Sequence, residues 1–417
     1  MDEPENVRRF KKWFTENGGQ VHPHVRFEGV TSGFSVVAAE DIPPETTAIS
    51  CPFSLAVTPE LSKHALLTLF KTDHTTTLDA WSERQLICTY LCMHWVVDSP
   101  EDSSVLLHRP YLNTLPSADK LRTPLHFTQS ELDALRGSNL YGATLDRQRE
   151  LQAEWTQCQT VVSAANEEWG QRFIWEQYLT AATYLSSRAF PSTLLSPNPS
   201  LVATSTSYPV LLPGVDALNH ARAQPVSWVV ARVPKGSTAS SDLAITLVLH
   251  AGTPRGRELL NNYGPKPNAE LILGYGFALP ANPDDTIVLK LGGASSAQSQ
   301  SRWEVGRDAR GAEPVWAAVL AAVTADADAI DIEDVFCAAD VLGEMAQNLL
   351  KRLPQPLHAD DAAGIRPDVA EMIGYYLEGQ RDILQSLIQF AQEKERQAEE
   401  AAREQGVLEI VNEDVEE

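Results

Sequence analysis

Three side chains that can do chemistry stand close together between residues 216 and 220. Asp216, Asn219 and His220 bring an acid, an amide and an imidazole into five positions, directly after a loop-like segment. Taken alone, this D-x-x-N-H pattern is also typical of a turn that closes on a hydrogen-bonded core histidine. Its chemical use therefore depends on what else the chain places beside it.

Two tyrosines follow in the sequence, and each stands directly before a glycine. They are Tyr263 and Tyr275, and the second belongs to the string Tyr275-Gly276-Phe277. An N-x-E-L string occupies residues 268–271 between them. Tyr-Gly pairs are also common in turns. The occurrence of these strings in this order after D-x-x-N-H is hard to explain by chance and indicates that they form one site.

Other motifs that carry chemistry are missing from the sequence. It contains no G-x-S-x-G elbow, no H-E-x-x-H metal motif and no P-loop, and Gly274-Tyr275-Gly276 lacks the third glycine of a dinucleotide fingerprint. The five cysteines form no C-x-x-C pair, and His22-Pro23-His24 has no acidic or thiolate partner at ligand spacing. We therefore expect no metal site and no disulfide framework.

Composition limits the class of partner. Of 417 residues, 33 are lysine or arginine and 56 are aspartate or glutamate, which gives a net charge of −23. A protein that binds nucleic-acid phosphates needs a basic face, so we expect no direct nucleic-acid binding. The negative field would instead attract a basic, lysine-rich protein. No apolar run reaches the ~18 residues of a membrane span. The acidic first residues do not form a secretory leader, so we expect no membrane partner and a cytoplasmic or nuclear location, or both.

The hydrophobic pattern predicts short β segments on either side of a helical region. Residues 86–95 carry an apolar stripe at helical spacing, and a second long helix is expected over residues 167–189. The apolar stripe of each helix indicates core packing. The other expected elements are a helix over 6–17, strands over 34–39, 48–51, 226–233, 243–250 and 259–263, a surface loop over 191–213, a linker over 292–301, and helices over 314–325, 332–353 and 367–403.

The order of these elements predicts the fold class. Strands, a helical insert, more strands and a helical end do not alternate as βαβ units do, which disfavours a doubly wound parallel sheet. We therefore predict an α+β fold.

Together the motifs resemble the SET-domain methyltransferases, in the branch typified by the Rubisco large-subunit lysine methyltransferase. That branch carries D-x-x-N-H, a strand ending in Y-G or Y-D, N-x-E-L and Y-G-F in the order found here. Residues 31–42 are similar to its opening cofactor loop and first strands, and Ser187-Arg188-Ala189-Phe190 matches the S-R-A-F that ends its helical insertion. The resemblance covers residues 7–290, and the helical remainder is similar in position and composition.

The resemblance implies a SET-domain β-fold of small sheets with a pseudoknot, a helical insertion and an all-α C-terminal substrate-binding domain. The implied boundaries are an N-terminal helix and first SET part over 1–58, the insertion over 59–190, the second SET part over 191–291, the helical domain over 302–403 and an acidic tail over 404–417.

The implied reaction is methyl transfer from S-adenosylmethionine (AdoMet) to a lysine nitrogen of a non-histone protein, such as a ribosomal protein or a translation factor. Two alternatives stay open: the same chemistry on another side chain such as histidine, and a SET-like module that binds a partner without catalysis. Ser32 and Ser35 keep the second alternative open, because relatives usually have a glycine where Ser35 stands and often an acid where Ser32 stands.

The resemblance also assigns cofactor contacts to single residues. Arg188 would pair with the cofactor's carboxylate, which suits a guanidinium, although a cation is also favoured at a helix C-terminus. Asn219 would bind the amino-acid end of the cofactor, and the backbone of His220 would bind the adenine. Asp216 would brace the turn or contact the cofactor. Further cofactor contacts are implied for the backbone of Ser32, Gly33 and Phe34 and for Tyr263 and Phe277.

Tyr263 is the implied catalytic residue. A free lysine has a pKa of about 10.4, so removing its proton at pH 7 costs about 4.6 kcal/mol, and an aromatic, water-poor channel lowers that cost by desolvation. The Tyr263 hydroxyl would orient the amine toward the methyl carbon. Tyr275 would line the same acceptor channel, and Trp228 would either add a further wall or pack in the core.

Overall fold

The structure, a computed structural model, describes residues 3–31, 33–71, 78–99, 102–234, 241–290, 302–324, 330–356 and 364–404. Three predicted features lie outside these ranges. They are the cofactor contact Ser32, the linker over 292–301 and the acidic tail after Glu404.

The chain divides into two compact units. Within the described ranges, the first consists of residues 1–126, 145–265 and 274–276, and the second of residues 127–144, 266–273 and 277–417. These units differ from the predicted domains at two places. Residues 127–144, which were predicted in the helical insertion, belong to the second unit. Residues 266–273 and 277–290, which were predicted in the second SET part, also belong to the second unit.

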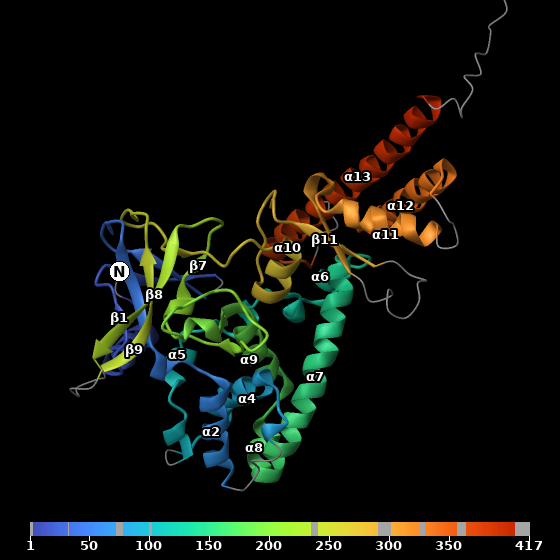
Figure 1. Cartoon of the computed structure of the whole chain (residues 1–417). Helices are drawn as coiled ribbons and strands as arrows, with labels where there is room; N and C mark the ends of the chain where they lie inside the picture. The colour runs from blue at the N-terminus through green and yellow to red at the C-terminus, as the bar shows by residue number, and fades with distance from the viewer. Residues whose placement is uncertain are drawn as a thin grey trace, which may run out of the picture. The chain divides into compact units, whose positions relative to one another are not determined.

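The first unit contains a four-stranded antiparallel sheet of β1 (Gln20–Val21), β4 (Thr46–Pro52), β9 (Ser241–Leu249) and β8 (Val226–Pro234), in that order. Figure 1 labels β1, β8 and β9 of this sheet. β8 and β9 form the predicted hairpin, and β4 pairs along the other edge of β9, from Thr46 opposite Leu249 to Pro52 opposite Ala244. The sheet therefore joins segments that lie on either side of the helical insertion.

Three shorter strand pairs complete the β structure described in the first unit. β2 (Val25–Val30) and β3 (Gly33–Ala38) are antiparallel, as are β5 (Phe190–Pro191) and β6 (Pro209–Val210), whereas β7 (Asn219–His220) and β10 (Leu260–Asn261) are parallel. The strands predicted near residues 34–39, 48–51 and 259–263 are thus confirmed, although the last is only two residues long.

Helices of the first unit enclose one hydrophobic core. They are α1 (Glu5–Glu16), α2 (Pro59–Phe70), α4 (Glu83–Val96), α5 (Arg109–Leu112), most of α7 (Asn139–Ala165), α8 (Glu167–Arg172) and α9 (Trp175–Arg188). α4 packs against both α2 and α9. α4 is more buried than its predicted apolar stripe indicated, because Cys88, Thr89 and His94 are also buried. α4 is therefore the central helix of this region rather than a half-exposed one.

The helix predicted over residues 167–189 is in fact two helices, α8 and α9, because the chain leaves helical geometry at Phe173 and Ile174. The carbonyl of Phe173 accepts a hydrogen bond from the indole N–H of Trp155 (3.1 Å), which takes the place of a helical partner. At this break Ile174 is 43% exposed, whereas Phe173 is fully buried. Spacing alone did not reveal this break.

Two histidines lie in the core of the first unit. The backbone N–H of His108 donates to Nε2 of His94 (3.2 Å), while Nδ1 of His108 lies 2.6 Å from the Tyr90 hydroxyl and its Nε2 lies 3.0 Å from the Leu55 carbonyl oxygen. Burial lowers the pKa of His94 to about 3 and the pKa of His108 to about 4. Both rings are therefore neutral at pH 7.

Acid should destabilise the first unit through these two rings. An unfolded histidine titrates near pH 6.5, so between about pH 6 and 4 the unfolded chain binds protons that the folded chain excludes, and the free energy of unfolding falls with pH. We expect a loss of about 1 to 3 kcal/mol per pH unit in that window. Urea unfolding at pH 7.5, 6 and 5 measures it.

Substitutions separate the two buried rings from other acid-sensitive groups. His94→Gln should flatten the pH dependence, whereas His64→Gln, which removes an exposed histidine of α2, should leave it unchanged. A wild-type free energy of unfolding that stays constant down to pH 5 would contradict the neutral burial of His94 and His108.

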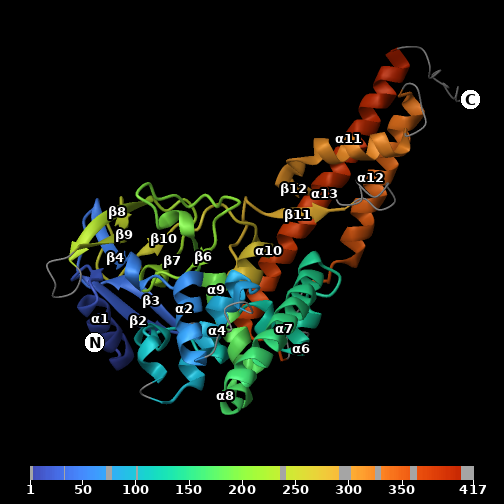
Figure 2. The ribbon, with the colours of Figure 1, turned by 60° about the horizontal axis from the view of Figure 1, so that its bottom comes forward.

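The second unit combines a short hairpin with a bundle of helices. Its elements are α6 (Gln129–Asp133), the start of α7, α10 (Asn268–Glu270), β11 (Thr286–Leu289), β12 (Trp303–Gly306), α11 (Ala312–Val323), α12 (Ile332–Arg352) and α13 (Pro367–Glu404). α12 packs along α13 (Figure 2) around buried side chains such as Leu342, Ile373 and Leu384. The three predicted C-terminal helices are confirmed. None of the helices in the described ranges has the length and apolar character that crossing a membrane requires.

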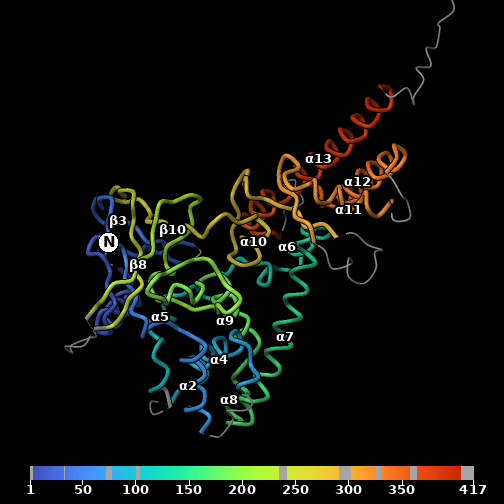
Figure 3. The backbone as a smooth tube through the Cα atoms, viewed as in Figure 1, coloured from blue at the N-terminus to red at the C-terminus, as the bar shows by residue number. Residues whose placement is uncertain are grey.

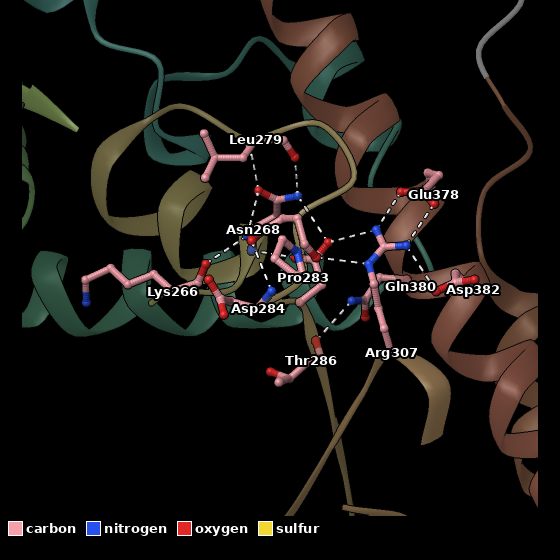
Figure 4. Close-up of polar contacts among 12 residues, drawn as sticks. Lys266, Asn268, Leu279, Pro283, Asp284, Thr286, Arg307, Glu378, Gln380 and Asp382 are labelled. Carbon is pink, nitrogen blue, oxygen red and sulfur yellow. Dashed lines mark hydrogen bonds and ion pairs between the residues drawn. The ribbon is translucent and has the colours of Figure 1, made fainter. Parts of the chain in front are cut away.

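Arg307 ties the hairpin of the second unit to α13. Its guanidinium lies 2.7 Å from Glu378 and 3.0 Å from Asp382 (Figure 4). It also lies 3.3 Å from Asp285. The backbone N–H of Asn268, the asparagine of the N-x-E-L string, donates to Asp285 (2.7 Å). Asp285 is almost fully buried, and burial raises its pKa to about 6 although Arg307 opposes the shift. Asn268 therefore has a structural role in this unit.

Two glycines of α13 should respond in opposite directions to alanine. A Cβ on the buried Gly379 would lie 2.3 Å from Oδ2 of Asp285, whereas a Cβ on the exposed Gly374 would meet nothing within 4 Å. We expect Gly379→Ala to lower the free energy of unfolding by about 1 to 3 kcal/mol and Gly374→Ala to raise it by about 1 kcal/mol through helix propensity. Denaturant unfolding of the full chain measures both, and equal effects would contradict the packing at Gly379.

Candidate active site

The D-x-x-N-H segment and the first Tyr-Gly segment meet through the parallel pair of β7 and β10. Asn219 lies opposite Leu260 and His220 opposite Asn261, and the N–H of Ala221 donates to the carbonyl of Asn261 (2.8 Å). Two strings about 40 residues apart in the sequence thus become neighbours. Because the register is fixed by this pairing, Tyr263 is placed beside the His220 ring.

Tyr263 lies between two aromatic rings. Its ring stacks on His220 (centroids 5.0 Å apart, planes at 26°) and on Tyr275 (5.2 Å, 26°). Its backbone N–H donates to Nδ1 of His220 (3.0 Å), and its hydroxyl donates to the carbonyl of Leu218 (2.9 Å). Burial raises the pKa of Tyr263 although Arg188 opposes the shift. The hydroxyl therefore stays protonated at neutral pH, and its oxygen lone pairs are available to accept a hydrogen bond.

Tyr275 owes its position to the glycine that follows it. It ends a π-helical turn, Leu271–Tyr275, and Gly276 has a φ of +83°. A Cβ at Gly276 would come within 2.8 Å of the backbone of Arg122. The Tyr-Gly pattern at this point is therefore required both by the left-handed backbone and by a close approach of two chain segments.

Arg188 and Asp216 form a buried ion pair. At the end of α9, Nη1 of Arg188 donates to the carbonyl of Asp216 (3.0 Å) and lies 3.6 Å from its carboxylate, which also accepts the Tyr111 hydroxyl (2.5 Å). The Asp216 side chain is 1% exposed and that of Arg188 is 22% exposed. Burial raises the pKa of Asp216, while Arg188 and Tyr111 hold it down. Asp216 thus holds both Arg188 and its own turn.

A pocket opens beside this ion pair. Its wall includes the rings of Phe10, Phe27 and Phe34, and its polar lining includes Tyr111, Arg188 and Asp216. Phe34 follows Gly33, which has a φ of +134° and is buried. Of the three predicted loop contacts, Phe34 therefore faces the pocket, Gly33 supplies a turn that a side chain would strain, and Ser32 lies outside the described residues.

Two side chains that the sequence analysis overlooked support the site. Tyr111, in the short helix α5, bonds to Asp216. Glu258 accepts hydrogen bonds from Ser35 (2.8 Å) and from Asn219 (2.7 Å). Neither belongs to a motif that was singled out, and neither lies near its partner in the sequence, so no local signal identified them.

The remaining two predicted residues are Trp228 and Phe277. Trp228, on β8, packs edge-on against Phe190 (centroids 5.2 Å apart) and against the core of the first unit. The rings that stack on Tyr263 are those of His220 and Tyr275, so the core role considered for Trp228 fits its position. Phe277 follows Gly276 and belongs to the second unit.

Comparison with known proteins identifies relatives of this chain, although no protein-family model matches it. It is 30% identical over 282 residues to the ribosomal lysine N-methyltransferase set10 of Schizosaccharomyces pombe, an alignment that covers 66% of this chain and 46% of that protein. It is 29% identical over 222 residues to the ribosomal lysine N-methyltransferase 1 of Saccharomyces cerevisiae, covering 44% and 34%. The chain thus spans less than half the length of these curated relatives.

Similar enzymes with other acceptors and solved structures extend the comparison. An actin-histidine N-methyltransferase of Gallus gallus is 24% identical over 290 residues, covering 68% of this chain and 44% of that protein. The SET domain of LSMT, solved with lysine and AdoHcy, aligns with a TM-score of 0.72 and 18% identity over 99% of this chain and 98% of that chain. Rubisco LSMT bound to AdoMet aligns over the same shares with a TM-score of 0.71 and 17% identity. These structures establish a mixed α+β SET-domain fold.

Proposed function

We propose that this chain is an AdoMet-dependent protein-lysine N-methyltransferase that acts on a non-histone protein. Two of its relatives are ribosomal lysine N-methyltransferases, and its fold is that of Rubisco LSMT. The observation that carries the proposal is the stack of His220, Tyr263 and Tyr275, with the Tyr263 hydroxyl fixed toward Leu218. Such a stack supplies an aromatic surface and one oriented polar atom.

The residues at the site fit AdoMet in its chemistry. The guanidinium of Arg188 suits a carboxylate, the side chain of Asn219 suits an amino-acid head group, and the aromatic wall of the pocket suits an adenine or a sulfonium. AdoMet, when bound, supplies a methyl carbon made electrophilic by the sulfonium. The solved structures of Rubisco LSMT contain AdoMet or AdoHcy and support this assignment.

In the proposed mechanism, the protein prepares and positions a neutral amine. The stacked rings exclude water, which favours loss of the lysine proton to solvent before transfer. The Tyr263 hydroxyl donates its hydrogen to the carbonyl of Leu218, so its oxygen is left to accept an amine N–H. This hydrogen bond would direct the nitrogen lone pair toward the methyl carbon. These residues would thus direct the amine nitrogen at the methyl group that AdoMet would supply when bound.

We further propose a basic, lysine-rich substrate, such as a ribosomal protein. Two observations support it. The chain carries a net charge of −23, which attracts basic partners, and two of its relatives are named as ribosomal lysine methyltransferases. The expected cytoplasmic or nuclear location and the expected lack of direct nucleic-acid binding stay predictions.

Methyl transfer from labelled AdoMet to purified ribosomal proteins tests the proposal, with peptide mass spectrometry to locate the label. Label on a lysine supports it. Label on a histidine would instead assign histidine methylation to the chain. This alternative is kept because the chain is similar to actin-histidine methyltransferases. If calorimetric titration shows no binding of AdoMet, the SET-like binding module without catalysis becomes the better assignment.

A further inference from the structure

Glu258 lies between two segments of the site. Its Oε1 atom accepts a hydrogen bond from the Ser35 hydroxyl of β3 (2.8 Å) and a second one from Nδ2 of Asn219 of β7 (2.7 Å). One carboxylate oxygen therefore joins the opening loop region to the D-x-x-N-H segment. This contact also gives the Ser35 hydroxyl a polar partner.

The backbone around Glu258 is fixed from both sides. Residue 258 forms an antiparallel bridge with Val37, the N–H of Leu259 donates to the carbonyl of Val36 (2.8 Å), and Leu260 pairs with Asn219 in the parallel strands. Figure 3 traces the backbone of this region, with β3 and β10 labelled. The Glu258 side chain is half-buried, whereas Asn219 is exposed. A carboxylate held in this way can act as a rigid reference for the amide beside it.

The contact decides which end of the Asn219 amide is offered to a ligand. An amide group has one donor end and one acceptor end. Because Nδ2 is directed at Glu258, Oδ1 is the end left to accept a hydrogen bond. An exposed asparagine without such a partner would rotate and present either end. An ammonium group requires the acceptor end.

We propose that Glu258, anchored by Ser35, is a positioning residue that fixes the Asn219 amide so that Oδ1 receives the α-ammonium group of AdoMet. This proposal rests on the proposed function and adds to it a specific recognition of the ammonium. Glu258 acts through Asn219 and does not touch the cofactor. Its carboxylate oxygens only accept hydrogen bonds, so Glu258 faces the donor end of the Asn219 amide.

Calorimetric titration of the full chain with two ligands tests this proposal. The ligands are AdoHcy and its desamino analogue, in which hydrogen replaces the α-amino group. Glu258→Ala should weaken AdoHcy binding about tenfold and leave the affinity for the desamino analogue unchanged. Asn219→Ala should do the same. The double variant should bind AdoHcy no more weakly than Asn219→Ala alone, because the two residues act as one unit.

Conservative variants and controls separate positioning from other roles. Glu258→Gln keeps an oxygen acceptor and should bind AdoHcy like the wild type, and Ser35→Ala should weaken AdoHcy by a smaller factor. Glu40→Ala removes an exposed carboxylate that pairs with Arg255 at 3.8 Å and should change nothing. Thermal unfolding without ligand shows which variants keep their fold.

Three results would overturn the proposal while the proposed function stands. They are additive losses in the double variant, equal weakening of both ligands by Glu258→Ala, and loss of binding in Glu258→Gln, which would mean that the charge acts on the cofactor itself. Failure of the folded wild-type chain to bind AdoHcy would overturn the proposed function as well.

Discussion

Replacing Tyr263 with phenylalanine should lower kcat by about 100-fold or more, because a misdirected amine loses the proximity that alignment supplies. The substitution keeps the aromatic ring that stacks on His220 and Tyr275 and removes only the hydroxyl that donates to Leu218. Affinity for AdoMet should therefore change little. Single-turnover methyl transfer and calorimetry measure the two quantities separately.

Tyr184→Phe is the matched control for this experiment. The Tyr184 hydroxyl also donates to a backbone carbonyl, that of Pro116 (2.5 Å), and Tyr184 is buried. Both substitutions should lower the free energy of unfolding by about 1 kcal/mol through the lost hydrogen bond. Only Tyr263→Phe should lower kcat. An unchanged kcat in Tyr263→Phe would remove Tyr263 from the catalytic role.

Replacing Arg188 with alanine should affect cofactor binding and stability at once. The lost guanidinium should weaken AdoMet binding by about 100-fold, because a bond between two charged groups contributes up to about 3 kcal/mol. The substitution also leaves the Asp216 carboxylate, 1% exposed, without its cation. Removing one partner of a buried ion pair typically costs about 3 to 5 kcal/mol of stability. Calorimetry and urea unfolding measure the two effects.

The double variant Arg188→Ala with Asp216→Asn separates these two effects. Removing the second charge should restore part of the lost stability, because no buried carboxylate then remains unpaired. It should not restore AdoMet binding, since the guanidinium is still missing. Wild-type affinity for AdoMet in Arg188→Ala would show that the arginine serves only the ion pair with Asp216.

Local patterns predicted most of the fold. The β8–β9 hairpin, α1 and the three C-terminal helices follow from periodicity and turn residues, which act over a few positions. The break between α8 and α9 was missed because its cause, the Trp155 hydrogen bond to Phe173, comes from another helix. The burial of α4 was understated because helices on more than one side cover it.

The site was predictable where it consists of motif residues and unpredictable where it depends on tertiary partners. The strings that contain Asn219, Tyr263 and Tyr275 can be read in the sequence, and the structure brings them together. Glu258 could not be found in this way, because its partners Ser35 and Asn219 lie 223 and 39 positions away. Asn268 shows that a motif residue can also have a structural role. It belongs to the N-x-E-L string, and its backbone N–H donates to Asp285 within the second unit.

The pairing of β4 with β9 has a consequence for synthesis of the chain. β4 ends at Pro52 and β9 spans Ser241–Leu249, so at about 5 to 20 residues per second the ribosome needs roughly 10 to 40 seconds to deliver the partner. During that interval one edge of β4, with the apolar residues Ala48, Ile49 and Cys51, has no strand to pair with. Nascent chains that stop before residue 241 should therefore depend on chaperones to stay in solution.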